Sequence, residues 1–316
     1  MINRRIIRIK ALQILYAFYN SPDKSLKNSE KELFFSIQKT YDLYHLMLNL
    51  VVEIQNYAQK RIDAGKQKFI PTPEDLNPNT RFADNKLIHL IRENTRLETY
   101  LTNNKLSWNN YPELIKKLYN EMKQSPAYEE YMSLPECSFT EDRKFIDKLF
   151  IRIILECEDL YHVLEEQSIY WNDDTEFVVS MIIKTLKKFK EDSIPASALP
   201  PMFKDDEDYD FARDLFRKVI LNHDQNKEII EKHLSNWDIE RVAYMDTLLM
   251  ELAITEFTEF VSIPTKVSLN EYIELSKYYS TERSSTFING ILDRILKDLK
   301  DNHLIQKAGR GLLGEE

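Results

Sequence analysis

The chain begins with a cluster of arginines whose type and spacing suit the binding of nucleic acid: Arg4, Arg5 and Arg8. A guanidinium group can bind a phosphate through two hydrogen bonds, and it can stack on an unpaired base. If residues 3–19 form a helix, at about 100° per residue, the arginines share one broad side with Tyr16 and Tyr19. The first 22 residues contain no acidic residue. This segment therefore fits a contact with RNA or DNA.

The opposite side of this helix is apolar, which predicts that it docks on the protein through Ile7, Ala11, Ile14 and Phe18. Lys10 lies toward the apolar side, and we expect its aliphatic stem to lead the ammonium group out to solvent. The alternative is an ordinary surface helix that carries a few arginines. On the residues alone that alternative is favoured, because three arginines make a modest basic patch.

The sequence shows no motif that is typical of an enzyme. It lacks a glycine-rich dinucleotide loop, a phosphate-binding P-loop and a zinc-binding H-E-x-x-H helix, and its six histidines are isolated. No Glu-x-x-His pair of a helical di-iron site is present. The two cysteines, Cys137 and Cys157, form neither a disulfide framework nor a metal-binding pair, which fits a reducing cytosol. We expect a cytoplasmic protein that is not an enzyme and that binds no metal or cofactor.

Composition predicts an all-α protein. Only five of the 316 residues are glycine, and three of these lie among the last eight residues. Sheets with tight hairpins need glycine for turns with positive φ. The net charge of −9 disfavours nucleic-acid binding as a sum, but the distribution of charge matters more. No apolar stretch of about 18 residues is present, so we expect no membrane span.

Helical patterns extend along most of the chain and are separated by two proline-rich linkers. The linkers are residues 66–82 and 194–201. The expected organisation has four parts: N-terminal helices in 1–81, a helical region of unknown role in 82–202, a C-terminal core in 203–302, and a disordered tail in 303–316. Within these parts we expect helices at 3–19, 26–64, 82–101, 111–123, 140–164 and 174–189, two more between 205 and 236, and three between 237 and 299.

The stretch 237–299 organises the whole chain. Its first and last helices carry apolar stripes at helical spacing, and Pro264 separates the first helix from the second. Its amino-acid sequence resembles the C-terminal half of NusB, the bacterial transcription antitermination factor. The pieces that match are IERVAYMDTLLMEL, IPTKVSLNEYIELSKYYS and STFINGILDRI. The start of the chain fits the same family, whose first helix has the form R-R-x-x-R-x-x-x-x-Q-x-L-Y. The resemblance covers about 22 residues at the N-terminus and about 95 at the C-terminus, and it resumes near Lys204.

This resemblance implies an all-α, NusB-like double helical bundle with an inserted helical region at 82–202. It implies transcription antitermination of ribosomal RNA operons, in which the protein binds boxA RNA together with the ribosomal protein NusE on the transcription elongation complex. The residues that it suggests for RNA binding are Arg4, Arg5, Arg8, Gln13, Tyr16, Glu240, Lys266, Phe287 and Asn289.

Several of these residues also have purely structural explanations. Glu240 is expected in the first turn of a helix, where a negative charge is favourable in any protein. Lys266 fits a solvated lysine almost as well, and Phe287 fits packing against the N-terminal helices. Gly290, which follows Asn289, costs about 1 kcal/mol in a helix relative to alanine, so a close approach of another helix or of RNA would explain it.

Two other functions remain open from the sequence. Some ribosomal RNA cytosine methyltransferases carry a NusB-like domain, although this chain lacks the glycine-rich cofactor loop of their catalytic domain. A helical protein–protein adaptor that has lost RNA binding is the other alternative, with 82–202 as its interface.

Overall fold

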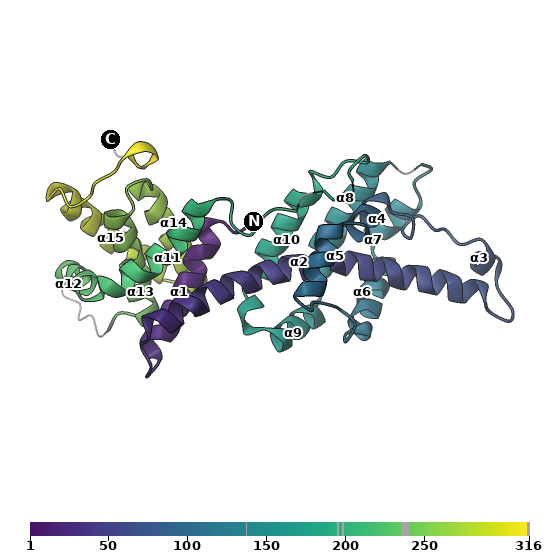
Figure 1. Cartoon of the computed structure of the whole chain (residues 1–316), viewed down its shortest axis with the longest axis horizontal. Coiled ribbons are helices and arrows are strands. Elements are labelled where there is room, and N and C mark those ends of the chain that lie inside the picture. Colours follow the sequence, from purple (N-terminus) through teal and green to yellow (C-terminus); the bar gives the residue numbers. More distant parts are fainter. Residues whose placement is uncertain (137, 195, 198, 235–240, 315–316) are drawn as a thin grey trace. The chain divides into compact units, whose positions relative to one another are not determined.

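The computed structural model of the chain describes residues 1–136, 138–194, 196–197, 199–234 and 241–314 (Figure 1). These residues form helices, turns and loops, and no strand occurs among them, which confirms the all-α class. None of the described helices contains a segment long and apolar enough to cross a membrane.

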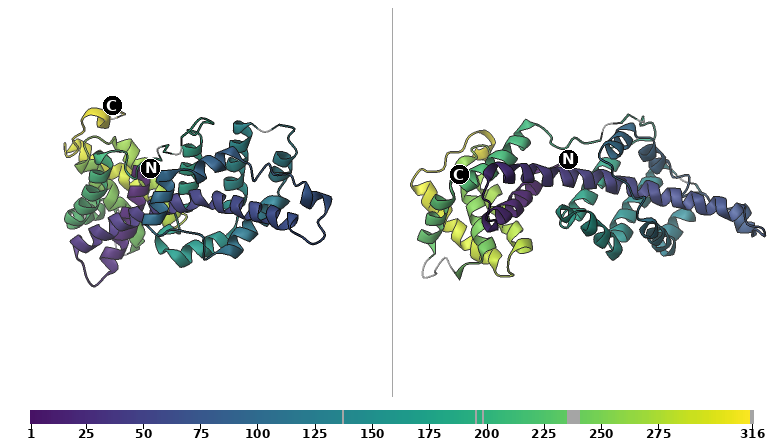
Figure 2. Two further views of the ribbon diagram at one scale, coloured as in Figure 1. Left: turned by 45° about the vertical axis from the view of Figure 1, so that its right-hand side comes forward. Right: turned by 60° about the horizontal axis from the view of Figure 1, so that its bottom comes forward.

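The chain divides into two compact units. Unit 1 consists of Met1 and residues 38–202, and unit 2 consists of residues 2–37 and 203–316. The long helix α2 (Leu26–Lys66) contributes residues 26–37 to unit 2 and residues 38–66 to unit 1 (Figure 2). The sequence analysis places the first boundary after residue 81 instead of 37. The difference arises because no glycine or proline interrupts the apolar pattern of α2 before Gly65, so two cores draw on one helix.

Unit 1 packs short helices around residues 38–66 of α2. The largest side chains of its core include Tyr44, Phe82 and Phe150, all nearly inaccessible to solvent. The Trp108 indole donates to the Leu46 carbonyl at 2.9 Å, which ties a loop to the long helix. The helices of this unit are α3 (Pro73–Leu76), α4 (Lys86–Arg92), α5 (Thr95–Asn103), α6 (Pro112–Gln124), α7 (Pro126–Met132), α8 (Phe139–Leu149), the π-helix η1 (Phe150–Ile154), α9 (Glu158–Gln167), the 3-10 helix η2 (Ile169–Trp171) and α10 (Thr175–Leu186).

Two of the helices expected in this region are divided. The segment 82–101 breaks into α4 and α5 at Asn94, whose side chain accepts from the backbone N–H of Leu97 at 3.0 Å. Asparagine is a favoured N-cap because its side-chain oxygen can replace a missing backbone acceptor. The segment 140–164 ends its α-helix at Leu149, continues as η1, and begins again at Glu158.

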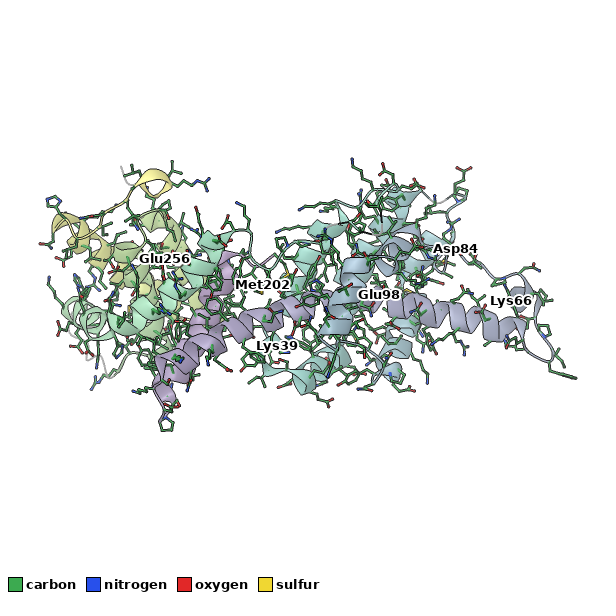
Figure 3. All side chains as sticks on the ribbon, viewed as in Figure 1. Lys39, Lys66, Asp84, Glu98, Met202 and Glu256 are labelled. Atoms are coloured by element: carbon green, nitrogen blue, oxygen red, sulfur yellow. The ribbon has the colours of Figure 1, made fainter. Side chains whose placement is uncertain are left out.

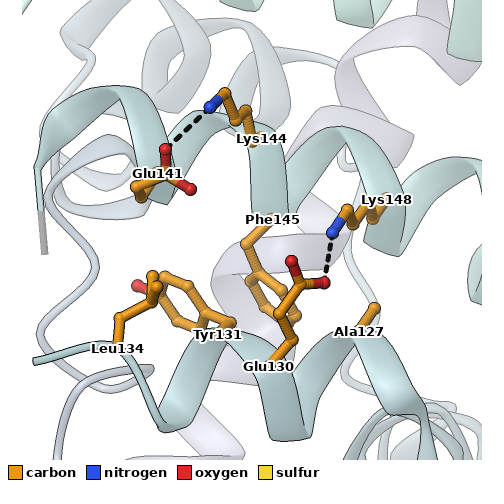
Figure 4. Close-up of a pocket in the computed structure, with 8 residues that line it drawn as sticks. All are labelled: Ala127, Glu130, Tyr131, Leu134, Glu141, Lys144, Phe145 and Lys148. Atoms are coloured by element: carbon orange, nitrogen blue, oxygen red, sulfur yellow. Dashed lines mark hydrogen bonds and ion pairs between the residues drawn. The ribbon is translucent and has the colours of Figure 1, made fainter.

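Unit 1 also has a small hollow between α7 and α8 (Figure 4). The rings of Tyr131 and Phe145 stack in it at 4.3 Å, and Lys148 pairs with Glu130 at 2.6 Å. Its volume of about 20 Å³ leaves room for roughly one water molecule. Side chains therefore fill this hollow, and it offers no place for a larger ligand.

Unit 2 is a helical bundle with α13 at its centre. Every residue of α13 from Asp246 to Phe257 is buried, and this helix packs against α1, α11, α12, α14 and α15. The labelled Glu256 of Figure 3 lies on α13 among these helices. The helices of the unit are α1 (Arg4–Asn20), the first part of α2, α11 (Asp206–Leu221), α12 (His223–His233), α13 (Tyr244–Glu259), α14 (Thr265–Tyr279), α15 (Ser284–Asp301) and the 3-10 helix η4 (Gly309–Leu312).

The C-terminal tail, which the sequence analysis expects to be disordered, folds back on the end of α13. The backbone N–H of Ala308 donates to the Val261 carbonyl at 2.9 Å, and Lys307 Nζ donates to the Phe260 carbonyl at 2.9 Å. A Cβ on Gly311 would lie 2.0 Å from the Val261 carbonyl oxygen, so only glycine permits this approach. The tail holds few apolar residues, and backbone hydrogen bonds replace the missing apolar contacts.

Candidate nucleic-acid interface

The arginine-bearing helix α1 lies deeper in unit 2 than its sequence predicts. Its N-cap is Asn3, whose side chain accepts from the Ile6 N–H at 3.0 Å. Ten of its 17 residues are buried, and they include Arg8 and Lys10. Lys10 is 1% exposed, so the expectation that its ammonium group reaches solvent is wrong. The face left to solvent is one sector that contains Arg5, Gln13, Tyr16, Ala17 and Asn20.

Arg8 is part of the core of unit 2 and not of the exposed basic face on which the sequence analysis places it. Its side chain is 4% exposed and binds Glu256 through two hydrogen bonds, from Nε at 2.9 Å and from Nη2 at 2.5 Å. The same carboxylate accepts from the hydroxyl groups of Ser268, at 2.6 Å, and Tyr272, at 2.8 Å. This network joins α1 to α13 and α14. Helical periodicity places Arg8 near Arg4 and Arg5, but it cannot reveal a buried partner 248 residues away in the sequence.

The electrostatics of this pair keep both groups charged. Burial alone would lower the pKa of Arg8, but the Glu256 carboxylate raises it above its usual value. Burial alone would raise the pKa of Glu256, but Arg8 and the two hydroxyl donors hold it below its usual range. A buried carboxylate with four hydrogen bonds satisfies the demands of a desolvated ion pair. Arg8 therefore has a structural role in this arrangement.

The other two arginines of the cluster differ from each other. Arg4 pairs with Asp208 at 3.2 Å and with Glu207 at 3.6 Å, and its guanidinium lies 5.1 Å from the centre of the Phe211 ring. It thus fastens α1 to the first turn of α11, although its side chain is still 30% exposed. Arg5 is partly exposed and forms no ion pair with a described carboxylate. Of the three, Arg5 is the one outside an ion pair, although it contributes, after Lys277, to the lowered pKa of Glu274 on α14.

Aromatic side chains mark the other end of α1. Tyr16 is 45% exposed, and the centre of its ring lies 5.8 Å from that of Tyr244, which is 42% exposed. Tyr244 is the first residue of α13, just before the fully buried part of that helix begins. The two rings form an exposed aromatic pair, the kind of surface on which unpaired bases stack.

Two hollows flank this pair, and Val242 lines both of them. We call the first the Phe287 hollow. It has a volume of about 270 Å³, and Arg241, Arg283 and Phe287 lie in its walls. Neither arginine forms an ion pair with a described carboxylate, and both are exposed. Deeper in the wall, the Ser284 hydroxyl donates to Asp246 Oδ2 at 2.8 Å, which fixes α15 against α13.

We call the second hollow the Tyr19 hollow. It has a volume of about 360 Å³ and is lined by residues of α1, α12 and α13 together with Lys24. His223 Nδ1 and Glu251 Oε2 lie 2.9 Å apart within it, and the ring of Tyr19 stacks on that of His223 at 4.6 Å. Because Val242 separates the two hollows and Tyr244 lines this one, the aromatic pair and both hollows form one continuous surface of unit 2.

The remaining residues suggested by the sequence lie in different places. Gln13 shares the exposed sector of α1 with Tyr16, and Phe287 gives its name to a hollow. Lys266 is exposed but lies beside the C-terminal tail, where its Cδ would be 3.4 Å from a Cβ on Gly314, and it lines neither hollow. Asn289 lies on α15 and is partly exposed. Glu240 lies outside the residues that the structure describes.

Gly290 has no structural explanation inside the protein. A Cβ built on it would have no neighbour within 4 Å, so the close approach of another helix that the sequence analysis considers does not occur among the described residues.

The sequence analysis does not single out several residues that form this surface. Glu251 is overlooked because residues 246–257 of α13 are buried on all sides and show no polar face; Tyr244 precedes that part of α13, and His223 begins α12 as an isolated histidine. Arg283, the N-cap residue of α15, also lines the Phe287 hollow. A signal existed for Tyr19, which shares the broad side of Tyr16 in the helical projection.

Comparison with known proteins agrees with the bundle of unit 2. Residues 179–297 match the model of the NusB family. The transcription antitermination protein NusB of Salinibacter ruber is 45% identical over 124 residues, which are 39% of this chain and 78% of that protein. The NusB protein of Chloroherpeton thalassium is 38% identical over 129 residues, which are 40% of this chain and 61% of that protein. A solved structure of T. maritima NusB is 28% identical and covers 44% of this chain and 85% of that one, with a TM-score of 0.29.

The match to the family model begins inside α10, which belongs to unit 1. The sequence analysis places the start of the C-terminal resemblance later, near Lys204. The residues before α10 that lie in unit 1 are outside the matched region. The identity to the Salinibacter ruber protein, over more than three quarters of that protein, shows the relationship directly. The chain therefore belongs to the NusB family, as a long form with a central helical insertion.

Proposed function

We propose that this protein is a cytoplasmic transcription antitermination factor of ribosomal RNA operons. It binds boxA-type RNA together with the ribosomal protein NusE on the transcription elongation complex. Its action is the assembly of RNA and protein, without covalent chemistry. Membership of the NusB family supports the biological role, because the relatives it matches are named transcription antitermination proteins.

The observation that carries the RNA-binding part is the exposed pair Tyr16 and Tyr244, which lies among cations that form no ion pair with a described carboxylate. Aromatic faces bind unpaired bases of any sequence, and nearby guanidinium groups bind the phosphates between them. Arg5 lies eleven residues before Tyr16 on the same sector of α1, which is about 16 Å along the helix axis. On the far side of Tyr244, Arg241 and Arg283 supply further positive charge beside the Phe287 hollow.

Each residue on this surface has a distinct role in the proposal. Tyr16 and Tyr244 stack bases, and Phe287 accepts a further base or apolar group. Arg5, Arg241 and Arg283 bind phosphates, and the polar side chains of Gln13 and Asn289 can read a base edge. Arg4 and Arg8 hold α1 in place through their ion pairs. NusE completes the site, which explains how a protein of net charge −9 can capture RNA.

The test is the binding of a labelled boxA-type RNA to the purified full-length protein, with and without NusE, at several salt concentrations. For single-stranded RNA, each phosphate contact contributes about −0.7 to the slope of log K against log salt concentration. We expect Arg5→Ala to weaken binding and to reduce the magnitude of that slope by about this amount.

Lys297→Ala is the matched control. Lys297 is an exposed cation of α15 that lies ten residues beyond Phe287, about 15 Å along the helix. Its loss changes the net charge as Arg5→Ala does but should leave the slope unchanged. Absence of RNA binding by the folded wild-type protein, with NusE and without it, would remove the RNA-binding role.

A second candidate function, a protein–protein adaptor, has one observation in its favour. The loop beyond the end of α2 exposes Phe69 completely and Ile70 to 80%. Exposed apolar side chains next to each other often mark a contact with another protein. If the wild-type protein retains NusE but binds no RNA under any of the salt conditions, the adaptor function replaces the RNA-binding one.

A further inference from the structure

The Tyr19 hollow contains polar groups that the fold itself does not use. The hydroxyl oxygen of Tyr19 is inaccessible to solvent, and it has no hydrogen-bond partner among the described residues. Buried hydroxyl groups in native proteins are nearly always paired, because an unpaired one costs free energy. Tyr19 is also a residue whose hydroxyl could be removed without loss of its ring stacking on His223. An unpaired group of this kind needs an explanation.

A second unused group lies in the same hollow. The Glu251 side chain is 1% exposed, and its Oε2 atom is bound to His223 Nδ1 at 2.9 Å. Its Oε1 atom accepts no hydrogen bond from any described residue. Burial raises the pKa of Glu251, and the Glu251 hydrogen bond raises the pKa of His223. A buried carboxyl group whose Oε1 atom accepts no hydrogen bond from a described residue, together with the unpaired Tyr19 hydroxyl, forms a polar floor beneath the hollow.

The walls and rim of the hollow define the chemistry of that ligand. Tyr244 supplies an exposed aromatic face, and Tyr19 and His223 supply a stacked pair of rings. Lys24 and Lys227 are exposed at the rim. The volume of about 360 Å³ is within the range of small-molecule sites. A flat aromatic ring with polar atoms on its edge and an attached anion satisfies all of these features.

We propose that the Tyr19 hollow holds one unstacked nucleobase of the bound RNA. The inference rests on the proposed function, because the hollow adjoins the aromatic pair Tyr16 and Tyr244. The base stacks on Tyr244 and, by displacing the side chains that cover them in the unbound protein, directs its edge to the Tyr19 hydroxyl and the Glu251 carboxyl group. Lys24 and Lys227 bind the flanking phosphates. Since the free oxygen of Glu251 is an acceptor, a base with an exocyclic amino group fits better than uracil.

The experiment compares wild type with Tyr19→Phe, which removes only the hydroxyl group. The ligands are a boxA-type RNA and a set of the same RNA in which one nucleotide at a time is abasic. Affinity is measured by fluorescence anisotropy. For wild type we expect one abasic position to reduce affinity strongly. Tyr19→Phe should weaken binding of the intact RNA by about three- to tenfold, the loss expected for one hydrogen bond, and should cause no further loss with RNA that is abasic at that position.

Thermal unfolding of the same variants separates a binding role from a structural one. Tyr19→Phe should unfold at the same temperature as wild type or at a higher one, because the hydroxyl makes no hydrogen bond within the protein. Tyr278→Phe is the matched control. Tyr278 is 74% exposed on α14 and lines neither hollow, so its hydroxyl should affect neither RNA affinity nor stability.

Three results would overturn the inference. Equal affinity of wild type and Tyr19→Phe for the intact RNA would leave the proposed function standing and remove the nucleobase site. If Tyr19→Phe weakens the binding of every abasic RNA by the same factor as that of the intact RNA, the hydroxyl contacts no base. Loss of NusE binding by Tyr19→Phe, with RNA affinity unchanged, would assign the hollow to a protein. Failure of wild type to bind RNA at all is a different outcome, which removes the proposed function as well.

Discussion

The two ends of α1 handle polar groups in opposite ways. At the arginine end, Arg4 and Arg8 are both bound by carboxylates of other helices, and Arg8 is buried in a network with Glu256. At the tyrosine end, the Tyr19 hydroxyl has no partner among the described residues, and the ring of Tyr16 is nearly half exposed. Both ends carry residue types that bind RNA in other proteins.

This difference separates residues that hold α1 in its place in the bundle from residues that are available to a ligand. A buried charge that is already paired inside the protein, such as that of Arg8, gains nothing by contact with a phosphate. A phosphate outside the protein also cannot reach it. A polar group without a partner costs free energy in the unbound protein, and a ligand can recover that cost. The arginine end therefore fixes α1, and in the proposed function the tyrosine end, together with Arg5, faces the RNA.

The largest effect that follows from this comparison is on stability. Arg8→Ala leaves the buried Glu256 carboxylate without its cation, which should destabilise unit 2 by about 3–5 kcal/mol. Hydrogen exchange of the α1 and α13 amides should show the loss of protection. Arg5→Ala serves as the control and should change stability by no more than about 0.5 kcal/mol. Equal stability of the two variants would contradict the division between the ends of α1.

A double variant sharpens that result. In Arg8→Met with Glu256→Gln, no unpaired charge remains, and the amide oxygen can still accept from the hydroxyl groups of Ser268 and Tyr272. We expect it to recover part of the stability that Arg8→Ala loses.

The second effect is on RNA affinity. Tyr16→Ala removes one stacking surface and should weaken boxA-type RNA binding by about 1–3 kcal/mol. Because Tyr16 is 45% exposed, the fold should be nearly unchanged. Fluorescence anisotropy gives the affinity, and hydrogen exchange of α1 checks the fold. The opposite pattern, a destabilised helix with unchanged RNA affinity, would place Tyr16 with the structural residues.

The sequence predicted most of the helices, because apolar periodicity reports burial on one side of a helix. It failed where capping overrides periodicity, as at Asn94, and where backbone contacts replace apolar packing, as in the tail at Gly311. It also could not locate the division after residue 37. An uninterrupted helix gives no local sign that its two parts belong to different cores.

The candidate site was predictable only in part, for a related reason. The projection of α1 placed Tyr16 on the exposed side, and the structure leaves it exposed. The same projection placed Arg8 on that side, although it is buried. Whether an arginine is free depends on a carboxylate far along the chain, here Glu256, and no local pattern records that partner. Glu251 was hidden because residues 246–257 of α13 are buried on every side.

A smaller effect on stability tests whether α15, like the tyrosine end of α1, carries a feature that the fold itself does not need. Gly290 is exposed within this helix, and a Cβ there would meet nothing within 4 Å. Gly290→Ala should therefore raise the stability of α15 by about 0.5–1 kcal/mol, through the lower backbone entropy of alanine in the unfolded chain. Hydrogen exchange of the α15 amides measures the gain. A loss of stability would mean that the backbone at residue 290 requires glycine for a reason internal to the protein.

The smallest expected effect is a pH dependence of the stability of unit 2, caused by the ionisable groups of the Tyr19 hollow. The hydrogen bond with Glu251 raises the pKa of His223 in the folded protein above the value near 6.5 of an unfolded chain. A raised pKa means that this contribution to stability is fully present below about pH 6.5 and is lost as pH rises through the folded value. Burial raises the pKa of Glu251 as well, so its titration acts in the same direction.

We therefore expect the amides of α12 and α13 to lose protection as the pH rises above about 6.5, after correction for the intrinsic exchange rate. In His223→Gln this decrease should be smaller, because the side chain that gains charge is gone. His162→Gln, a change on α9 in unit 1, should leave the pH dependence of unit 2 as in wild type. A profile for His223→Gln that matches wild type would show that the pair does not titrate as its geometry indicates. The tyrosine end would then lose its only ionisable link between α12 and α13 among the contacts described for this hollow.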